Sequence, residues 1–330
     1  MKNIAILGAT GLVGEEVLRI LEQRNFPTGE VFLFASEKSE GKTMIYKDRE
    51  IGVFTDYENF IDQADISFGC LDAPLAREII PKIRNRTVVI DNSNAFRMDP
   101  EVPLVVPEVN PKEVEKHKGI IANPNCSTIQ MVVVLYPLHK KAKITRIFVA
   151  TYQSVSGYGR DAVDELKYEI ECLGAEENIE KYGDSIFSFP IGNNVIPQIG
   201  SFNEEGYTTE EMKMVNETRK IFGEESIRVV STCVRIPVFV GHSETVSVEF
   251  ESPILPVDAK KILKNAPGVT LFDEDDKYPM PFHAAGNDAV FVGRIRKDLV
   301  FENGLAMWIV ADNIRKGAAL NAVQIAELLL

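Results

Sequence analysis

The sequence predicts an α/β protein in which a doubly wound parallel sheet is followed by a second, α+β domain. Three observations support this prediction. Short apolar runs alternate with helical patterns over the first third of the chain, a glycine-rich turn follows the first run, and longer alternating runs begin after about residue 127. A length of 330 residues is enough for about two domains, each with its own core.

The first third contains short apolar runs of the kind that form buried strands. They lie at Asn3–Leu7, Val31–Phe34, Asp65–Leu71, Thr87–Asp91 and Gly119–Ala122. Between the first two runs, residues 11–24 carry Val13, Val17, Leu18, Ile20 and Leu21 at helical spacing. Strands that alternate with helices in this way indicate a parallel sheet with helices on both faces.

Beyond residue 127 the runs are longer, and apolar and polar residues alternate along them. The runs are Arg146–Gln153, Ile227–Pro237 and Ser243–Glu251, with helical patterns at 161–173, 209–222 and 314–330. The helix at 161–173 is expected to carry one apolar stripe, formed by Val163, Leu166, Ile170 and Leu173. Long antiparallel strands with helices to one side indicate an α+β domain.

Composition excludes several classes of partner and site. The chain has 49 acidic and 36 basic residues, and a net charge of −13 argues against a nucleic-acid backbone or an anionic membrane as its partner. No apolar stretch approaches the roughly 18 residues of a membrane span, and the start is too short for a signal peptide. The 4 cysteines lack CxxC spacing and accompany only 4 histidines, so we expect no disulfides, no metal site and a cytoplasmic protein.

A glycine-rich turn, Gly-Ala-Thr-Gly-Leu-Val-Gly at residues 8–14, follows the first strand and opens the first helix. Its spacing is GxxGxxG rather than GxGxxG, but it offers the same tight turn and the same bare N–H groups at a helix start. This context predicts a Rossmann-like dinucleotide-binding domain; the alternative is a tight turn without a ligand. The expected cofactor contacts are Gly8, Thr10, Gly11, Leu12, Val13 and Gly14.

The residues after the second strand favour NADP over NAD. Ser36, Lys38 and Ser39 suit a 2′-phosphate, whereas an acidic residue at this point accepts hydrogen bonds from the NAD ribose. Glu37 lies among them and leaves dual use of NAD and NADP open. Lys38 is equally well explained as a solvated loop charge.

One cysteine differs from the other three. Cys126 lies in Asn-Pro-Asn-Cys-Ser-Thr, directly before the apolar helical run 129–138. A helix start stabilises a thiolate, and a nucleophilic cysteine beside a nicotinamide site indicates thioester chemistry. The alternative is a structural N-cap. Cys70, Cys172 and Cys233 lie in apolar strand or helix patterns and are expected to be buried hydrophobic residues.

Two polar residues in the strand region are candidates to act with this cysteine. His242 stands where a strand resumes after Gly241, whereas His117 and His139 lie among lysines. Arg235 lies within the apolar run Cys-Val-Arg-Ile-Pro-Val. A buried arginine needs an anionic partner, which is either a substrate carboxylate or a structural ion pair.

Together these motifs resemble the aspartate-β-semialdehyde dehydrogenase family. The matching segments are GATGLVG at 8–14, SNAFRM at 93–98, NPNCST at 123–128, TYQSVSGYG at 151–159, EEMK at 210–213 and CVRIPVFVGHSE at 233–244. They span nearly the whole chain in the family's order. The resemblance implies NADPH-dependent conversion of L-aspartyl-4-phosphate to L-aspartate 4-semialdehyde through a cysteine acyl-thioester, in lysine, threonine and methionine biosynthesis.

The resemblance also implies residue roles. Cys126 is the nucleophile, His242 the acid/base and Gln153 a substrate-orienting group, while Arg235 binds the α-carboxylate. The implied phosphate ligands are Arg97, Lys213 and Asn125.

The same resemblance extends to the nucleotide, the domains and the assembly. Contacts to the nucleotide are implied for Ser156, Gly157 and Asn313. Residues 1–127 and 314–330 would form the NADP-binding domain and residues 128–313 the catalytic and dimerisation domain, in a homodimer or homotetramer.

The substrate's charges separate two neighbouring glutamates. Thr208-x-x-Glu211 is a capping-box pattern, which gives Glu211 a structural role at a helix start. Glu210 and Lys213 are three residues apart and therefore share a helix face, so that one could contact the substrate ammonium and the other the phosphate. The alternative is an ordinary surface ion pair, which contributes little.

Two other functions remain alternatives. N-acetyl-γ-glutamyl-phosphate reductase performs the same chemistry, but its acetylated substrate has no ammonium for Glu210 to contact. An NADP-binding regulatory protein that has lost catalysis would not be expected to keep Cys126, Gln153, Arg235 and His242.

Overall fold

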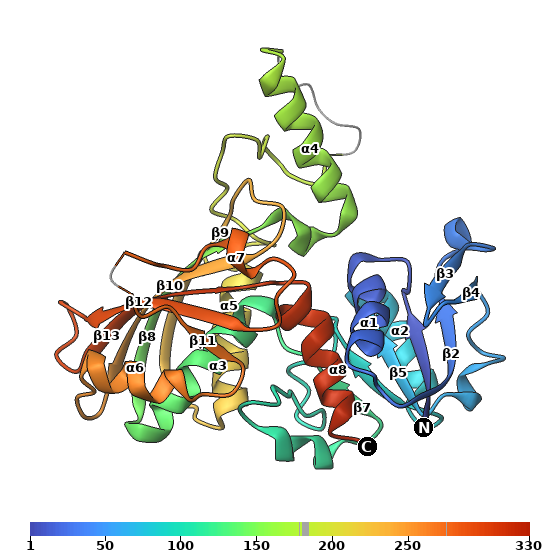
Figure 1. The fold of residues 1–330 in the computed structure, drawn as a ribbon, viewed down its shortest axis with the longest axis horizontal. Coiled ribbons are helices and arrows are strands. Elements are labelled where there is room, and N and C mark those ends of the chain that lie inside the picture. Colours follow the sequence, from blue (N-terminus) through green and yellow to red (C-terminus); the bar gives the residue numbers. More distant parts are fainter. Residues whose placement is uncertain (178, 180–184, 275) are drawn as a thin grey trace. The chain divides into compact units, whose positions relative to one another are not determined.

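The computed structural model describes residues 1–177, 179, 185–274 and 276–330 (Figure 1). These residues form two compact units. Unit 1 contains Met1–Asn125 and Gly317–Leu330, and unit 2 contains Cys126–Lys316. Unit 1 has a largely parallel sheet and unit 2 a mixed sheet covered by helices, which confirms the predicted fold class. None of the helices in the described ranges is long and apolar enough to cross a bilayer.

Unit 1 is built on a seven-stranded sheet in the order β3-β4-β2-β1-β5-β6-β7. The strands are β1 (Lys2–Leu7), β2 (Thr28–Phe34), β3 (Thr43–Tyr46), β4 (Arg49–Phe54), β5 (Ile66–Gly69), β6 (Val88–Asp91) and β7 (Ile120–Ala122). All neighbouring pairs run parallel except β3 and β4. The central strands are apolar along most of their length because helices cover both faces of a parallel sheet.

The helices of unit 1 are α1 (Leu12–Gln23), α2 (Ala73–Ile83) and the C-terminal α8 (Leu320–Glu327). Of these, α1 and α8 bury their apolar stripes in one core. Val17 and Leu21 of α1 and Val323 of α8 are all fully buried in the same cluster as Ile4 and Ile6 of β1. The tail therefore packs into the core formed by the first strand and first helix. A π-turn at Arg315–Ala319 precedes α8, where the sequence predicted a single helix over 314–330.

The β3–β4 hairpin was not predicted from the sequence. Its two-residue turn consists of Lys47 and Asp48, which have φ angles of 49° and 60°. Such a turn requires two residues in the left-handed region, and Asn-Gly or Asp-Gly usually provides them. Because Lys-Asp lacks that signature, the pattern gave no turn signal.

Unit 2 is built on a six-stranded sheet in the order β11-β12-β13-β10-β8-β9. The strands are β8 (Ile144–Gln153), β9 (Arg228–Arg235), β10 (His242–Phe250), β11 (Val269–Leu271), β12 (Val290–Lys297) and β13 (Gly304–Ala311). β8 is antiparallel to β10 but parallel to β9, so the expectation of an antiparallel sheet was wrong. The physical reason is the long, helix-containing connection between β8 and β9, which is a crossover rather than a hairpin.

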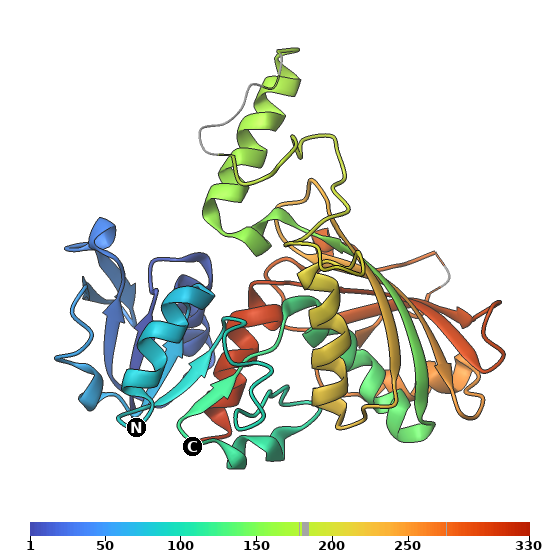
Figure 2. The same cartoon turned by 180° about the vertical axis from the view of Figure 1, so that it is seen from behind.

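Three helices cover one face of this sheet. The helices of unit 2 are α3 (Cys126–Lys141), α4 (Arg160–Gly174), α5 (Thr209–Phe222), α6 (Pro256–Lys264) and α7 (Pro281–Ala284). α3, α5 and α6 pack on one face of the sheet (Figure 2). Val246, Val248 and Phe250 alternate along β10, point to this face and are buried. Phe148, Tyr152 and Val230 are on the opposite face and are partly exposed.

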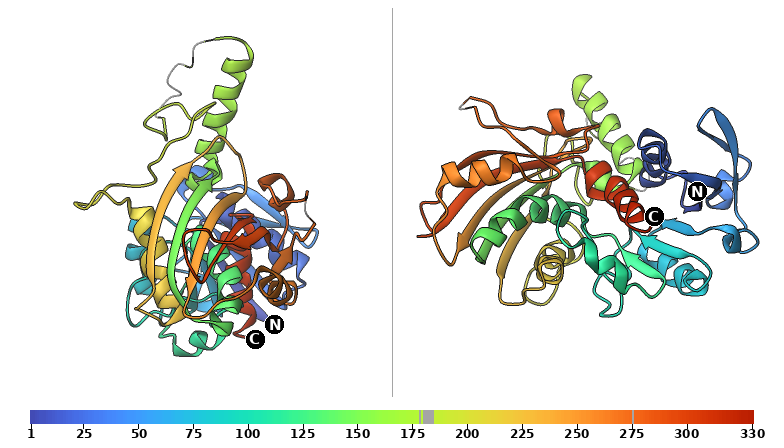
Figure 3. Two further views of the ribbon diagram at one scale, coloured as in Figure 1. Left: turned by 90° about the vertical axis from the view of Figure 1, so that its left-hand side faces the viewer. Right: turned by 60° about the horizontal axis from the view of Figure 1, so that its bottom comes forward.

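The helix α4 stands away from the sheet (Figures 1 and 3). Leu166 is fully buried, but Ile170 and Leu173 are 44% and 40% exposed. The sequence placed these residues on one apolar stripe, and in the structure the first half of the stripe is buried while Ile170 and Leu173 remain partly exposed.

Candidate active site

The polar residues of unit 2 gather at one edge of its sheet. Gln153 ends β8 and Arg235 ends β9, and the two residues are paired in register. His242 begins β10 and is paired with Ala311, two residues before Asn313. Because β10 runs antiparallel to β8 and β13, its first residue lies at the edge where those strands end. The topology thus brings Gln153 together with side chains that lie about 80 to 160 residues further along the sequence.

Cys126 is the first residue of α3, as the motif predicted. The helix is apolar on most sides, and every residue from 127 to 135 is buried, which holds its first turn in the core of unit 2. The N–H groups and dipole at this end favour the thiolate form. In contrast, burial raises the pKa of the Cys70 thiol to about 12 and also raises the pKa of Cys233. Only Cys126 therefore has a setting suited to a nucleophile.

The imidazole of His242 is completely buried. Its Nδ1 accepts a hydrogen bond from the Ser154 N–H at 3.0 Å, which places the ring proton on Nε2. Nε2 has no hydrogen-bond partner among the described residues. Burial, and then the charge of Arg235, lower the pKa of His242 to about 3. The unliganded site therefore holds a neutral imidazole with an unpartnered N–H donor.

Arg235 is also buried, with only 2% of its surface exposed. Its Nη1 donates to the Ser154 carbonyl oxygen, and its guanidinium carbon lies 4.4 Å from the centre of the Tyr158 ring. Nε has no hydrogen-bond partner in the described part of the chain, and no carboxylate there forms an ion pair with Arg235. The structural ion pair that was the alternative for this residue is therefore not formed, and the guanidinium is available to an anionic ligand.

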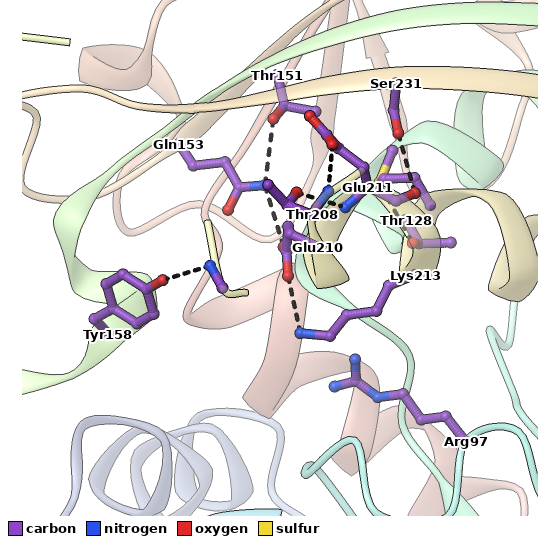
Figure 4. A network of polar contacts seen from close by, with 12 residues as sticks. Arg97, Thr128, Thr151, Gln153, Tyr158, Thr208, Glu210, Glu211, Lys213 and Ser231 are labelled. Carbon is purple, nitrogen blue, oxygen red and sulfur yellow. Dashed lines mark hydrogen bonds and ion pairs between the residues drawn. The ribbon is translucent and has the colours of Figure 1, made fainter. Parts of the chain in front are cut away.

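Gln153, Glu210 and Lys213 form one hydrogen-bonded chain (Figure 4). Gln153 Nε2 donates to Glu210 Oε1 at 3.2 Å, and Lys213 Nζ donates to the second carboxylate oxygen at 2.9 Å. The side chain of Glu210 is only 7% exposed, so this is not an ordinary surface ion pair. The capping box predicted for Thr208 and Glu211 is present. Glu211 therefore caps the start of α5, whereas Glu210 belongs to the candidate site.

Unit 1 carries a backbone cradle at the end of β1. Gly8 has φ +84°, and a Cβ there would lie 2.2 Å from the Cys70 carbonyl oxygen. A Cβ at Gly14 would lie 2.3 Å from the Gly8 carbonyl oxygen. Gly11 precedes α1 without any side-chain cap, so the N–H groups of Leu12, Val13 and Gly14 at the helix start face no capping side chain. This arrangement fits the pyrophosphate of a dinucleotide.

The second loop of unit 1 meets this cradle. Thr10 Oγ1 lies 3.1 Å from Ser39 Oγ, which joins the glycine turn to the turn after β2. Ser36 and Lys38 are exposed beside Ser39 and point away from the core. A hydroxyl pair with an exposed lysine suits a 2′-phosphate.

Two further predicted residues of unit 1 are buried. Arg97 is 8% exposed, and its Nε and Nη2 donate to the carbonyl oxygens of Asn123 and Asn92, each at 2.9 Å. Asn125, the last residue of this part of unit 1, is 5% exposed. The backbone thus fixes the Arg97 guanidinium.

The predicted nucleotide contacts of unit 2 lie beside the site edge. Asn313 Oδ1 accepts hydrogen bonds from Ser154 Oγ at 2.9 Å, from Ser156 Oγ at 3.3 Å and from the Gly241 N–H at 2.9 Å. A Cβ at Gly157 would lie 2.9 Å from Arg235 Nη1 and 3.5 Å from His242 Nε2. The turn containing Ser156 and Gly157 therefore borders both candidate catalytic side chains.

Several residues of the site were not singled out from the sequence. Ser154 contacts His242 through both its N–H and its hydroxyl, and Tyr158 lies against Arg235. Glu244 is fully buried and shares the inward face of β10 with His242. An acidic residue on an otherwise apolar strand face was a usable signal for Glu244. Ser154 and Tyr158 lie in a motif with other polar residues, and nothing local distinguished them.

Burial raises the pKa of the Glu244 carboxyl well above its usual range, and the side chain of Gln130 on α3 offsets part of that rise. Gln130 stands four residues after Cys126, one helical turn along α3. Burial therefore favours the neutral form of Glu244, which lies on the inward face of β10. No group of three or more His, Cys, Asp or Glu side chains that could bind a metal was found in the described ranges.

Comparison with known proteins assigns both units. The profile described as "Semialdehyde dehydrogenase, NAD binding domain" matches residues 3–117, and "Semialdehyde dehydrogenase, dimerisation domain" matches residues 135–316. A protein of Aquifex aeolicus (strain VF5) named aspartate-semialdehyde dehydrogenase is 54% identical over 99% of this chain and 98% of its own length. The chain belongs to the aspartate-semialdehyde dehydrogenase family. It is accordingly an oxidoreductase with a nicotinamide-cofactor domain, as the sequence motifs indicated.

Solved structures of the family agree with this assignment. Aspartate semialdehyde dehydrogenase II of Vibrio cholerae, complexed with ASA, has a TM-score of 0.97 and 47% identity, covering 100% of this chain and 98% of its own. A Candida albicans aspartate semialdehyde dehydrogenase with NADP has a TM-score of 0.78 and 26% identity, covering 100% of this chain and 98% of its own.

Proposed function

We propose that the protein converts L-aspartyl-4-phosphate and NADPH to L-aspartate 4-semialdehyde, phosphate and NADP, reversibly and through an acyl-thioester on Cys126. The observation that carries this proposal is the arrangement of unit 2, where a cysteine at a helix start belongs to the same unit as a neutral histidine and an arginine without a carboxylate partner. Membership of the family supports the same reaction. The reaction belongs to lysine, threonine and methionine biosynthesis, with diaminopimelate on the lysine branch.

The charges of the site match the charges of this substrate. Aspartyl phosphate carries an α-carboxylate, an ammonium and a phosphate. Arg235 binds the α-carboxylate, and Glu210, buried beside Gln153, accepts the ammonium. Lys213, Arg97 and Asn125 bind the phosphate. An N-acetylated substrate has no ammonium for Glu210 to contact, so Glu210 favours the aspartyl substrate.

The chemical steps use groups of this chain. The Cys126 thiolate attacks the acyl carbon, an S–C bond forms, and the C–O bond to the phosphate breaks with release of inorganic phosphate. Gln153 orients the acyl group. NADPH, when bound, supplies the hydride that reduces the thioester. His242 is the acid/base: once protonated to the imidazolium beside the anionic substrate, it donates its Nε2–H to the oxygen or sulfur that gains negative charge and becomes neutral, and in the reverse direction the neutral ring takes up that proton.

The cofactor is NADP. The glycine cradle at residues 8–14 holds the pyrophosphate, and Ser36, Lys38 and Ser39 hold the 2′-phosphate. Ser156, Gly157 and Asn313 contact the nucleotide. The NADP-binding domain comprises 1–127 and 314–330, and the catalytic and dimerisation domain comprises 128–313.

The protein acts as a homodimer or a dimer of dimers in the cytoplasm. The uncovered sheet face of unit 2 presents Phe148, Tyr152 and Val230, and α4 presents Ile170 and Leu173. Apolar side chains gathered on one unit favour association with a second copy. The four cysteines are free, which fits a reducing compartment.

A spectrophotometric assay tests the reaction. Purified protein is mixed with aspartate semialdehyde, phosphate and NADP, and the absorbance of the reduced nicotinamide is followed, with NAD and phosphate-free controls. We expect absorbance to rise only with phosphate and faster with NADP. Activity with N-acetylglutamate semialdehyde instead of aspartate semialdehyde would show that the substrate is the longer, acetylated compound. Absence of activity with both substrates would favour an NADP-binding regulatory protein.

A further inference from the structure

We propose that Tyr158 is a positioning residue that fixes the plane of the Arg235 guanidinium and thereby sets the affinity for the α-carboxylate of the substrate. The inference rests on the role proposed above for Arg235. It concerns a residue that touches neither the reacting carbonyl nor the thiol in that scheme, and that acts through the arginine.

Arg235 makes few contacts for a buried arginine. A guanidinium has five N–H donors, yet Arg235 Nη1 donates a hydrogen bond to the Ser154 carbonyl oxygen while Nε has no partner among the described residues. One hydrogen bond does not define the orientation of a plane. A second constraint is needed if the group is to receive a carboxylate along two parallel N–H bonds.

The ring of Tyr158 provides that constraint. The guanidinium carbon lies over the ring at 4.4 Å from its centre, which is within the range of a cation–π contact. On another side, a Cβ at Gly157 would come within 2.9 Å of Nη1. The backbone of Gly157 and the face of Tyr158 therefore border the same group. A ring face restrains the plane without using an N–H donor, so the donors stay available to the substrate.

Tyr158 is itself held in place although it is 41% exposed. Its hydroxyl accepts a hydrogen bond from the Gly200 N–H at 3.0 Å (Figure 4). Its ring lies 5.8 Å from the ring of Phe187, which is buried. Tyr158 also ends the short 3₁₀ turn Val155–Tyr158 that follows β8. An exposed tyrosine anchored at its hydroxyl and its ring, with a buried arginine on its face, is suited to orient that arginine.

The first test is the Tyr158→Leu variant, assayed in the direction of aspartate semialdehyde oxidation. We expect KM for aspartate semialdehyde to rise about tenfold, because a desolvated cation–π contact contributes on the order of 1–2 kcal/mol. kcat and the KM values for phosphate and NADP should stay within about twofold, since a positioning effect on one carboxylate contact is local. Tyr158→Phe keeps the ring and should raise the same KM less than Tyr158→Leu does.

A matched control is Tyr136→Leu, which removes another tyrosine of unit 2 with a cation over its ring, Lys140 at 5.0 Å. This variant should leave every KM unchanged. Equal increases in both variants, or a change in kcat rather than KM for Tyr158→Leu, would overturn the inference. A fall in melting temperature without any change in KM would make Tyr158 structural only.

Arg235→Lys separates this inference from the proposed role of Arg235. If Arg235→Lys leaves KM for aspartate semialdehyde unchanged, the proposed role of Arg235 fails first. If Arg235→Lys raises KM but Tyr158→Leu does not, the role of Arg235 stands and that of Tyr158 fails. When both act through the same contact, the double variant should be no worse than Arg235→Lys alone.

Discussion

The two units of this protein build their proposed binding sites in different ways. In unit 1 the cradle consists mainly of backbone, contributed by one continuous turn at residues 8–14 in which Gly8 and Gly14 leave no room for a Cβ. In unit 2 the site consists of side chains that come from β8, α5, β9 and β10 and from the start of α3. The cradle of unit 1 is formed by residues adjacent in the sequence, whereas the site of unit 2 is assembled only when the sheet has formed.

This difference determines how each site should respond to change. A backbone site is disturbed by adding atoms, because any side chain collides with a neighbouring carbonyl oxygen. A side-chain site is disturbed by removing or reshaping single groups, each of which affects one step. Substitutions should therefore separate cofactor binding from chemistry.

The largest expected effect is that of Cys126→Ala. Loss of the nucleophile should reduce kcat about 10⁴-fold or more, because no acyl-thioester can form. NADPH binding, measured by quenching of protein fluorescence, should stay within about twofold of the wild type. Substantial remaining turnover would show that Cys126 is not the nucleophile. Weakened NADPH binding would show that Cys126 also affects cofactor binding, so that chemistry and cofactor binding are not separable.

Gly14→Ala in unit 1 should weaken NADPH binding, which Cys126→Ala should leave nearly unchanged. A Cβ there would lie 2.3 Å from the Gly8 carbonyl oxygen and 2.8 Å from the Ala9 Cα, so the turn must shift. We expect about 2–4 kcal/mol lower stability and at least about tenfold weaker NADPH binding. Gly174→Ala is the matched control, since among the described residues no atom outside the helix's own nearby backbone lies within 4 Å of a Cβ at that position. Similar NADPH affinity in both variants would argue against a backbone cradle.

Arg235→Lys should have a smaller and more selective effect. The lysine keeps the charge but cannot form two parallel N–H bonds to a carboxylate. KM for aspartate semialdehyde should rise about tenfold, with the melting temperature changed little. A lower melting temperature with unchanged KM would instead make Arg235 a structural residue of unit 2.

The smallest expected effect is on stability, from Glu244→Gln. Burial holds the folded-state pKa of this carboxyl well above the unfolded value. Its contribution to stability is therefore fully present below about pH 4.5 and is lost as the pH rises toward the folded-state pKa. The neutral glutamine avoids that loss. At pH 8 the free energy of unfolding of the variant should therefore exceed that of wild type by at least about 1 kcal/mol, and this difference should disappear near pH 4.

Urea unfolding at both pH values measures this difference. The control is Glu251→Gln, which changes an exposed glutamate just beyond β10. An advantage of equal size at pH 4 and pH 8 would show that titration of Glu244 is not its cause.

The contrast between the units also explains what could be predicted from the sequence. The parallel strands of unit 1 and the helix after the glycine turn follow from local periodicity, and their positions agree to within a few residues. The capping box at Thr208 and Glu211 was equally readable, because its partners are three residues apart. Local structure could be predicted where its residues carry a recognised signature; the β3–β4 hairpin, whose Lys-Asp turn lacks one, was missed.

Contacts between distant segments were not predictable in the same way. The parallel pairing of β8 with β9 depends on a crossover of more than 70 residues, and no local pattern encodes its direction. The contact of Tyr158 with Arg235 joins the start of that crossover to the end of the strand that follows it. The resemblance to a family supplied residue roles for the site, but not how Ser154 holds the imidazole of His242.

The distribution of the four thiols has a practical consequence for covalent probes. Cys172 is buried, and burial raises the pKa of the Cys233 thiol and raises that of Cys70 to about 12, so each of these three thiols is disfavoured as a target, by limited access or by a raised pKa. Cys126 alone begins a helix. A mild electrophile added in modest excess should therefore attach once per chain, and intact-mass measurement would count active sites directly. The same property makes the native protein suitable for screening acrylamide or chloroacetamide fragments without prior removal of competing cysteines.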